Sequence, residues 1–277
     1  MNIIIATLVV SFGLALLLGF LLGFFKKVFH VEVDPTEAAV RAVLPGVNCG
    51  GCGYPGCDGF AAAVAAGDAP VNGCTAGGAE TAKAVGDVMG QTVSAETRAV
   101  VLLCQGTLDK CPAKAEYIGV RTCKAAKLSV NGTKLCDWGC IGFGDCEVAC
   151  PFDAIHVQAD GIPHVDYAKC TGCGLCVAAC PQMILRLEPA RRTGAIALCS
   201  NRNTRKAQVI KDCKTGCIKC MKCEKVCPKQ CIKVINGIPV VDYVVCDSCG
   251  ECVKNCPTKV LALLEETVTV PSRSEGT

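Results

Sequence analysis

Residues 170–181 read CTGCGLCVAACP, and the spacing of their four cysteines ahead of a proline decides the fold. The same C-x2-C-x2-C-x3-C-P run recurs at residues 217–228 and at residues 246–257. In such a run three thiolates hold one 4Fe–4S cluster, and the fourth cysteine reaches a second cluster. Three complete runs predict a chain that is organised around iron–sulfur clusters.

Cysteine makes up 26 of the 277 residues, whereas aromatic residues account for only 5%. We therefore expect clusters to replace much of the hydrophobic core. A secreted disulfide scaffold is the competing explanation, but the spacing is that of metal-binding motifs. A net charge of +3, without a basic tract interleaved with aromatics, predicts no nucleic acid partner. No G-x-G-x-x-G motif opens a helix after a strand, so no dinucleotide-binding fold is predicted.

The first 25 residues contain no charged side chain and are mostly aliphatic. About 20 apolar residues suffice to cross a bilayer as a helix. A cleaved signal peptide is the alternative, but the segment lacks a basic start and a small-residue cleavage site. Lys26 and Lys27 follow directly, which places the rest of the chain in the cytoplasm by the positive-inside rule. We expect a single-pass protein of the cell (inner) membrane with its cluster domains in the reducing cytoplasm.

A separate motif follows this anchor, with the spacing C-x2-C-x4-C-x16-C over Cys49, Cys52, Cys57 and Cys74. Glycines crowd its first three cysteines, where backbone must approach a cluster and offer N–H groups to sulfur. A zinc knuckle is the alternative, and the neighbouring cluster motifs favour iron. The sequence therefore predicts a first 4Fe–4S site in this segment.

The remainder of the chain contains an internal duplication. Residues 161–167 read GIPHVDY and residues 237–243 read GIPVVDY, an offset of 76 positions. We therefore expect an α+β fold with a single N-terminal transmembrane helix, a small helical 4Fe–4S domain and tandem bacterial-type two-cluster ferredoxin modules. The expected boundaries are 1–25 for the transmembrane anchor, 26–34 for a linker, 35–90 for the N-terminal cluster domain, 91–190 and 191–265 for the two modules, and 266–277 for a flexible tail.

Ligand sets follow from the interlaced rule, in which three cysteines of one run combine with the last cysteine of the other. One site departs from it, because Phe143 stands where the repeat would place the counterpart of Cys220. Cys136 lies one helical turn before Cys140 and can supply the missing thiolate. The predicted sets are Cys217, Cys220, Cys223 and Cys256; Cys246, Cys249, Cys252 and Cys227; Cys170, Cys173, Cys176 and Cys150; and Cys136, Cys140, Cys146 and Cys180.

Six cysteines lie outside these five sites. A sixth cluster is predicted between the modules, and Cys111 or Cys231 could replace one of its four ligands. The other interpretation is that the six are small buried hydrophobic residues, as free cysteines often are. The predicted ligands of the sixth cluster are Cys104, Cys123, Cys199 and Cys213.

The uncharged N-terminal span, the first cysteine motif, the stretch CIGFGDC at residues 140–146 and the tandem runs together resemble the B subunits of Rnf complexes. The resemblance covers nearly the whole chain and matches the long, multi-cluster form of the family. It implies a membrane-anchored electron-transfer subunit with no substrate chemistry of its own. Such a subunit accepts electrons from reduced ferredoxin in a complex that couples ferredoxin:NAD electron transfer to Na⁺ or H⁺ translocation. The implied partners are ferredoxin and the other membrane and NAD-binding subunits.

A basic segment carries the predicted docking surface. Residues 201–233 contain ten Lys or Arg residues and only two acids. Ferredoxins are commonly acidic, so Lys219, Lys222 and Lys225 are predicted to dock one by electrostatic steering. A solvated face that offsets the negative charge of the clusters is the alternative.

Three other functions fit parts of the pattern. The chain could be a polyferredoxin subunit of another membrane redox complex, or a reducing system for an iron–sulfur transcription regulator. A zinc-binding scaffold is the third, and it would be colourless and inactive in electron transfer.

Overall fold

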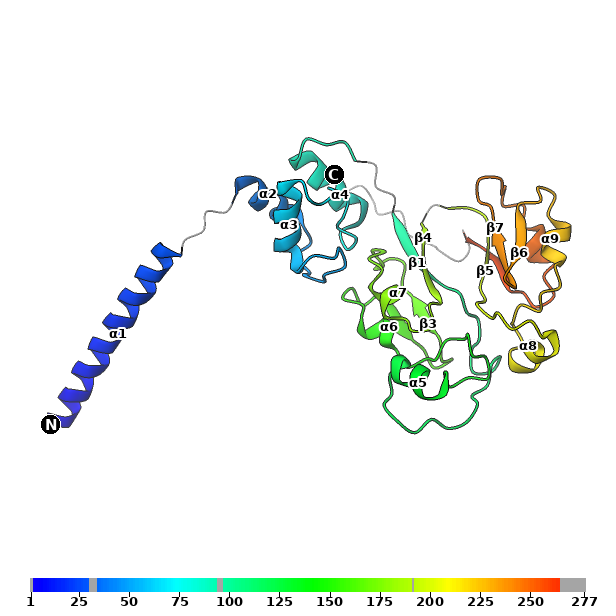
Figure 1. Ribbon diagram of the computed structural model, residues 1–277, viewed down its shortest axis with the longest axis horizontal. Coiled ribbons are helices and arrows are strands. Elements are labelled where there is room, and N and C mark those ends of the chain that lie inside the picture. The colour runs from blue at the N-terminus through cyan, green and yellow to red at the C-terminus, as the bar shows by residue number, and fades with distance from the viewer. Residues whose placement is uncertain (1, 30–33, 94–96, 191, 265–277) are drawn as a thin grey trace.

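The computed structural model describes residues 2–29, 34–93, 97–190 and 192–264. Helix α1 (Asn2–Val28) stands apart from the other elements (Figure 1). Among the described residues, Thr7–Val28 is the one helix long and apolar enough to cross a membrane. The predicted tail at 266–277 lies outside the described residues.

Three helices form the N-terminal domain: α2 (Pro35–Val43), α3 (Gly56–Ala66) and α4 (Gly78–Val88). The carboxylate of Asp34 caps α2 by accepting a hydrogen bond of 2.7 Å from the amide of Thr36. Val40, Phe60 and Val85 form the centre of a small core that also contains cysteines. This domain is helical, as the sequence predicts.

Two further modules follow, each with four short strands. The first contains β1 (Arg98–Leu102), α5 (Cys123–Val130), α6 (Asp145–Val148), β2 (Ile155–Val157), β3 (Pro163–Val165), α7 (Leu175–Ala179) and β4 (Leu185–Pro189). The second contains β5 (Ala195–Ala197), α8 (Lys206–Asp212), α9 (Lys222–Val226), β6 (Ile232–Ile235), β7 (Ile238–Val241), α10 (Glu251–Lys254) and β8 (Leu261–Leu263).

The modules share one strand topology. In the first, β1 pairs with β4 and β2 with β3, all antiparallel; in the second, β5 pairs with β8 and β6 with β7. The mixed helix and sheet content agrees with the predicted fold class. Val101 of the first module and Ile196 and Leu264 of the second are buried in a common core, so the modules pack on each other near their outer strands.

The helices α5 to α10 are too short to be stable on their own, since isolated helices need roughly 12–15 residues. The cores of the two modules contain many cysteines, for example Cys217, Cys223 and Cys252 around Ile232. Backbone also approaches backbone closely: Gly172 has a φ of 70°, and a Cβ there would collide with the carbonyl oxygen of Arg98 in β1. The short helices and the cysteines in the cores agree with the expectation that bound clusters replace much of the hydrophobic core.

Candidate iron–sulfur centres

Most of the cysteines form six groups, five of which line hollows, and we label the groups site A to site F in their spatial order. Site A lies in the N-terminal domain, where a hollow of about 320 Å³ is lined by Cys49, Cys52, Cys57 and Cys74. The side-chain oxygen of Asn48 accepts a hydrogen bond of 2.8 Å from the amide of Cys57 and so holds the loop at the start of α3. The four thiols of the predicted set thus face one space.

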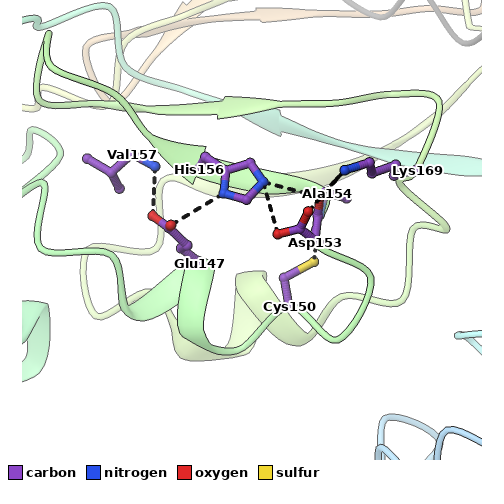
Figure 2. Close-up of polar contacts among 7 residues, drawn as sticks. All are labelled: Glu147, Cys150, Asp153, Ala154, His156, Val157 and Lys169. Atoms are coloured by element: carbon purple, nitrogen blue, oxygen red, sulfur yellow. Dashed lines mark hydrogen bonds and ion pairs between the residues drawn. The ribbon is translucent and has the colours of Figure 1, made fainter.

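Site B lies in the first module and is lined by Cys150, Cys170, Cys173 and Cys176 around a hollow of about 330 Å³. This is the set that the interlaced rule predicts. Figure 2 shows the polar contacts that hold its Cys150 wall. The amide of Ala154 donates to the sulfur of Cys150 (3.4 Å), and Glu147 accepts from the amide of Val157 (2.9 Å). Glu147 also contacts His156, and Asp153 pairs with Lys169. These two contacts brace the turn between α6 and β2.

Site C, also in the first module, differs from the predicted grouping. Its hollow of about 360 Å³ is lined by Cys123, Cys140, Cys146 and Cys180, so Cys123 occupies the place assigned to Cys136. The carboxylate of Asp145 explains this arrangement. Its two oxygens accept hydrogen bonds from the amides of Cys123 (2.8 Å) and Lys124 (3.0 Å), which fixes the first turn of α5 against the site.

Sites E and F lie in the second module. Site E is a hollow of about 350 Å³ lined by Cys217, Cys220, Cys223 and Cys256. Site F is a hollow of about 340 Å³ lined by Cys227, Cys246, Cys249 and Cys252, together with a fifth cysteine, Cys231. Both four-cysteine sets are those predicted from the runs.

Site D lies between the modules and has internal twofold pseudosymmetry. Cys104 of the first module accepts hydrogen bonds on its sulfur from the amides of Gly106 and Cys140, both at 3.4 Å. Cys199 of the second accepts in the same way from the amides of Asn201 (3.5 Å) and Cys217 (3.4 Å).

The other two thiols of site D form a second equivalent pair. Cys136 and Cys213 each begin a turn in which the amide of the glycine three residues later donates to their own carbonyl, at 3.0 and 3.1 Å. The side-chain amide of Asn201 also donates to the sulfur of Cys136 (3.4 Å). Site D therefore contains Cys136 in place of the predicted Cys123, with Cys111 as an additional buried neighbour.

Within the described ranges, no three His, Cys, Asp or Glu side chains converge on the position of a single metal ion. At sites A, B, C and E four thiols line a hollow instead, and at site F five thiols do so. Burial raises the pKa of Cys136 and Cys176 to about 12 and that of Cys223 to about 11. These thiols are neutral near pH 7 unless a cationic centre binds the thiolate, so the donor chemistry fits iron in a cluster.

Comparison with known proteins agrees with this chemistry. A family described as "Putative Fe-S cluster" matches residues 44–76, a 4Fe–4S dicluster domain matches residues 134–187, and a 4Fe–4S binding domain matches residues 214–234 and 245–259. The chain is 41% identical to the B subunit of the Na⁺-translocating ferredoxin:NAD⁺ oxidoreductase complex of Acetobacterium woodii, over 89% of this chain and 74% of the relative. It is 38% identical to the B subunit of the ion-translocating oxidoreductase complex of Methanosarcina acetivorans, over 95% of this chain and 99% of the relative.

A third relative is the B subunit of the proton-translocating ferredoxin:NAD⁺ oxidoreductase complex of Clostridium ljungdahlii, 38% identical over 93% of this chain and 92% of the relative. The chain belongs to the Rnf B-subunit family. This membership confirms the resemblance seen in the sequence and an iron–sulfur electron-transfer role. Four of the candidate thiols of this family member lie outside all three matched segments: Cys104, Cys123, Cys199 and Cys213.

In this Rnf B subunit the six sites form one continuous series. Cys173 of site B packs against the core that surrounds site A. Sites B and C share the core around Ile155, and sites E and F share the core around Ile232. Site D touches site C through Cys140 and site E through Cys217, by the hydrogen bonds to sulfur described above. The series therefore runs from the domain behind α1 to the second module.

The three lysines predicted to dock a partner have different surroundings. Lys222 and Lys225 are exposed on α9, close in sequence to the exposed cysteine of site E, Cys220. The ammonium group of Lys219 instead donates to the carbonyls of Asn201 (3.2 Å) and Cys217 (3.4 Å). Lys219 therefore links site E to the loop of site D.

A buried lysine also lies beside the central sites, and the sequence alone did not reveal it. Lys134 is only 3% exposed, and its ammonium group donates to the carbonyls of Gly106 and Gly161, each at 2.8 Å. Burial raises the pKa of the Cys104 thiol, and the nearby charge of Lys134 opposes that rise. Lys134 thus favours the thiolate form at site D.

Proposed function

We propose that sites A to F each hold one 4Fe–4S cluster. On this proposal the chain relays electrons from reduced ferredoxin to the membrane and NAD-binding subunits of an Rnf-type complex, which couples ferredoxin:NAD electron transfer to Na⁺ or H⁺ translocation. A bound 4Fe–4S cluster accepts and releases one electron at a potential set by its protein surroundings. The observation that carries the proposal is the continuous series of six sites, each with at least four cysteines, between the domain behind α1 and the second module.

The protein's part in this function is to supply thiolates, to exclude water and to donate hydrogen bonds to sulfur. Amides donate to the sulfurs of Cys104, Cys150, Cys199 and Cys256 at 3.3–3.5 Å. Such donors stabilise the more negative, reduced state and so raise the potential of the site that they face. Differences in these donors between sites are expected to grade the potentials along the series.

Helix α1 is proposed to anchor the chain in the cell (inner) membrane as a single span. Lys26 and Lys27 lie in its last turn, which favours a cytoplasmic position for the domains that follow. The free thiols would remain reduced there, as cluster assembly requires. Proteolysis of sealed vesicles of known orientation tests this topology.

Ferredoxin is proposed to dock on the exposed face of α9, where Lys222 and Lys225 lie near Cys220. An acidic partner would be steered to this face, and the exposed ligand of site E would face it. Lys219 is proposed to act instead as an internal tether, because its ammonium group donates to two carbonyls of the same chain.

The test begins with the full-length protein purified anaerobically in detergent. About 24 iron and about 24 sulfide per chain are expected for six clusters, and mixing with reduced ferredoxin should bleach the visible absorbance rapidly. The double variant K222E/K225E should slow this reduction by roughly tenfold or more at low salt and lessen its salt dependence. The control K206E/K211E carries the same charge change on α8. Equal rates for the two variants would refute docking at α9, and zinc in place of iron would refute the function itself.

A further inference from the structure

Sites B and F occupy equivalent places in the two modules and have nearly the same lining. Cys150 corresponds to Cys227 at an offset of 77 positions, and the other three cysteines correspond at an offset of 76. One position differs in a way that changes the chemistry. Ala154 lines site B, and its counterpart at the same offset of 77 is Cys231, which lines site F.

The backbone around this position is the same in both modules. The carbonyl of Ala154 accepts a hydrogen bond of 2.8 Å from Asp166, and the carbonyl of Cys231 accepts one of 2.7 Å from Asp242. Each position lies in the turn that leads from a Cys-Pro pair into a strand. Because the backbone is unchanged, the side chain of Cys231 simply adds a sulfur to the wall of the hollow.

This fifth thiol lies beside a predicted ligand. The sulfur of Cys231 is 3.5 Å from the sulfur of Cys227, and the Cys231 residue is only 9% exposed. A cubic cluster has four irons and takes four thiolates, whereas five thiols line site F. One thiol must therefore remain protonated next to a thiolate ligand.

We propose that Cys231 and Cys227 are interchangeable ligands of the cluster at site F. In the exchange a bound cluster would lose its iron–sulfur bond to Cys227 and gain one to Cys231, and the proton of the Cys231 thiol would pass to the Cys227 sulfur. No oxidation state changes and no other reactant is needed. A side-chain movement suffices, because the two sulfurs already touch on the same wall of the hollow.

The exchange would protect the site at the far end of the series, which has solvent-accessible thiols. Cys249, another thiol of site F, is exposed to solvent, and Cys246 is partly exposed. A cluster that loses its bond to Cys227 would keep four thiolates through Cys231. Site B has no such reserve, because Ala154 cannot bind iron.

The inference rests on the proposed function, and the internal repeat supplies its control. Iron and sulfide are measured on full-length anaerobic protein for C227A and for the matched variant C150A in site B. C150A should lose about four of about 24 irons, whereas C227A should keep them all. C231A should also keep them, and C227A/C231A should lose about four. Adding a thiol to site B in C150A/A154C should restore the iron lost from C150A.

A loss of about four irons from C227A would overturn the exchange while leaving the proposed function intact. So would a loss of about one iron from C227A with the electron paramagnetic resonance signal of a three-iron cluster. A loss of iron from C231A alone would also overturn it, since Cys231 would then be an obligatory ligand. Wild-type protein without iron and sulfide would instead refute the proposed function, and the exchange with it.

Discussion

Lys134 offers the sharpest test of how the central sites are held. Its ammonium group is buried and joins two segments through the carbonyls of Gly106 and Gly161, each at 2.8 Å. Lys134→Met keeps the length of the side chain and removes both donors and the charge. Lys211 is its counterpart in the second module, at an offset of 77 positions, and it is exposed. Lys211→Met is therefore the matched control.

The expected magnitude follows from the two carbonyls that lose their partner. Each buried acceptor left without a hydrogen bond costs about 1–3 kcal/mol. The variant no longer has to desolvate an ammonium group, which offsets part of this loss and leaves a net destabilisation of about 2–4 kcal/mol. The cost falls on sites C and D, since Lys134 lies near the thiols of Cys104, Cys140 and Cys213.

Iron release to a chelator measures this cost if the chelator reaches a cluster only after local opening. A change of 2–4 kcal/mol then corresponds to a roughly 30- to 700-fold faster release, at a factor of ten for every 1.4 kcal/mol. The fast phase should involve about a third of the bound iron, that of two sites in six. Lys211→Met should release iron as the wild type does. Release from Lys134→Met within about twofold of wild type would refute the structural role of Lys134.

Three further predictions concern other parts of the fold. Gly172→Ala should destabilise the first module by about 2–4 kcal/mol, because the new Cβ would collide with β1 and the backbone at this position is left-handed. Gly67→Ala is the control: its Cβ would meet open space, so the left-handed backbone alone should cost about 1 kcal/mol, and thermal melting followed by absorbance distinguishes the two variants. Asp145→Ala should release Cys123 and lower the iron content by about four per chain. Asp137→Ala removes an exposed ion pair and should leave the iron content unchanged; equal iron contents in the two variants would contradict the role of Asp145 in positioning Cys123. Removal of all iron should abolish most circular dichroism signal from the two modules but not that from α1, and modules that stay folded without iron would contradict a cluster-based core.

Much of the candidate site could be predicted from sequence because cluster motifs are local. Cysteines separated by two residues face the same cluster and the fourth cysteine of a run faces the neighbouring cluster, so sites A, B, E and F have the thiols that the spacing predicts. Ligation at these sites stays a prediction until iron is measured. The duplication was likewise visible in the repeated segment that ends in Asp166-Tyr167 and Asp242-Tyr243.

The irregular sites could not be assigned in this way. Cys136 is the neighbour of Cys140 in sequence, which led to its assignment to site C. The structure places it in site D, where its turn has an equivalent around Cys213. Cys123 reaches site C from the start of α5 because Asp145 binds its amide. A signal for this pairing was present, since Asp145 precedes Cys146 in the motif, but its partner is distant in sequence.

The sequence by itself therefore indicated the cofactor class, the tandem modules, the apolar N-terminal segment and the grouping of the cysteines at sites A, B, E and F. Local spacing restricts which thiols can share a cluster, whatever the rest of the fold does. Only the tertiary structure decided how the modules share site D, which thiols complete sites C and D, and where Lys134 and Cys231 lie. These depend on segments far apart in the chain meeting through packing and hydrogen bonds, and no spacing rule encodes such contacts.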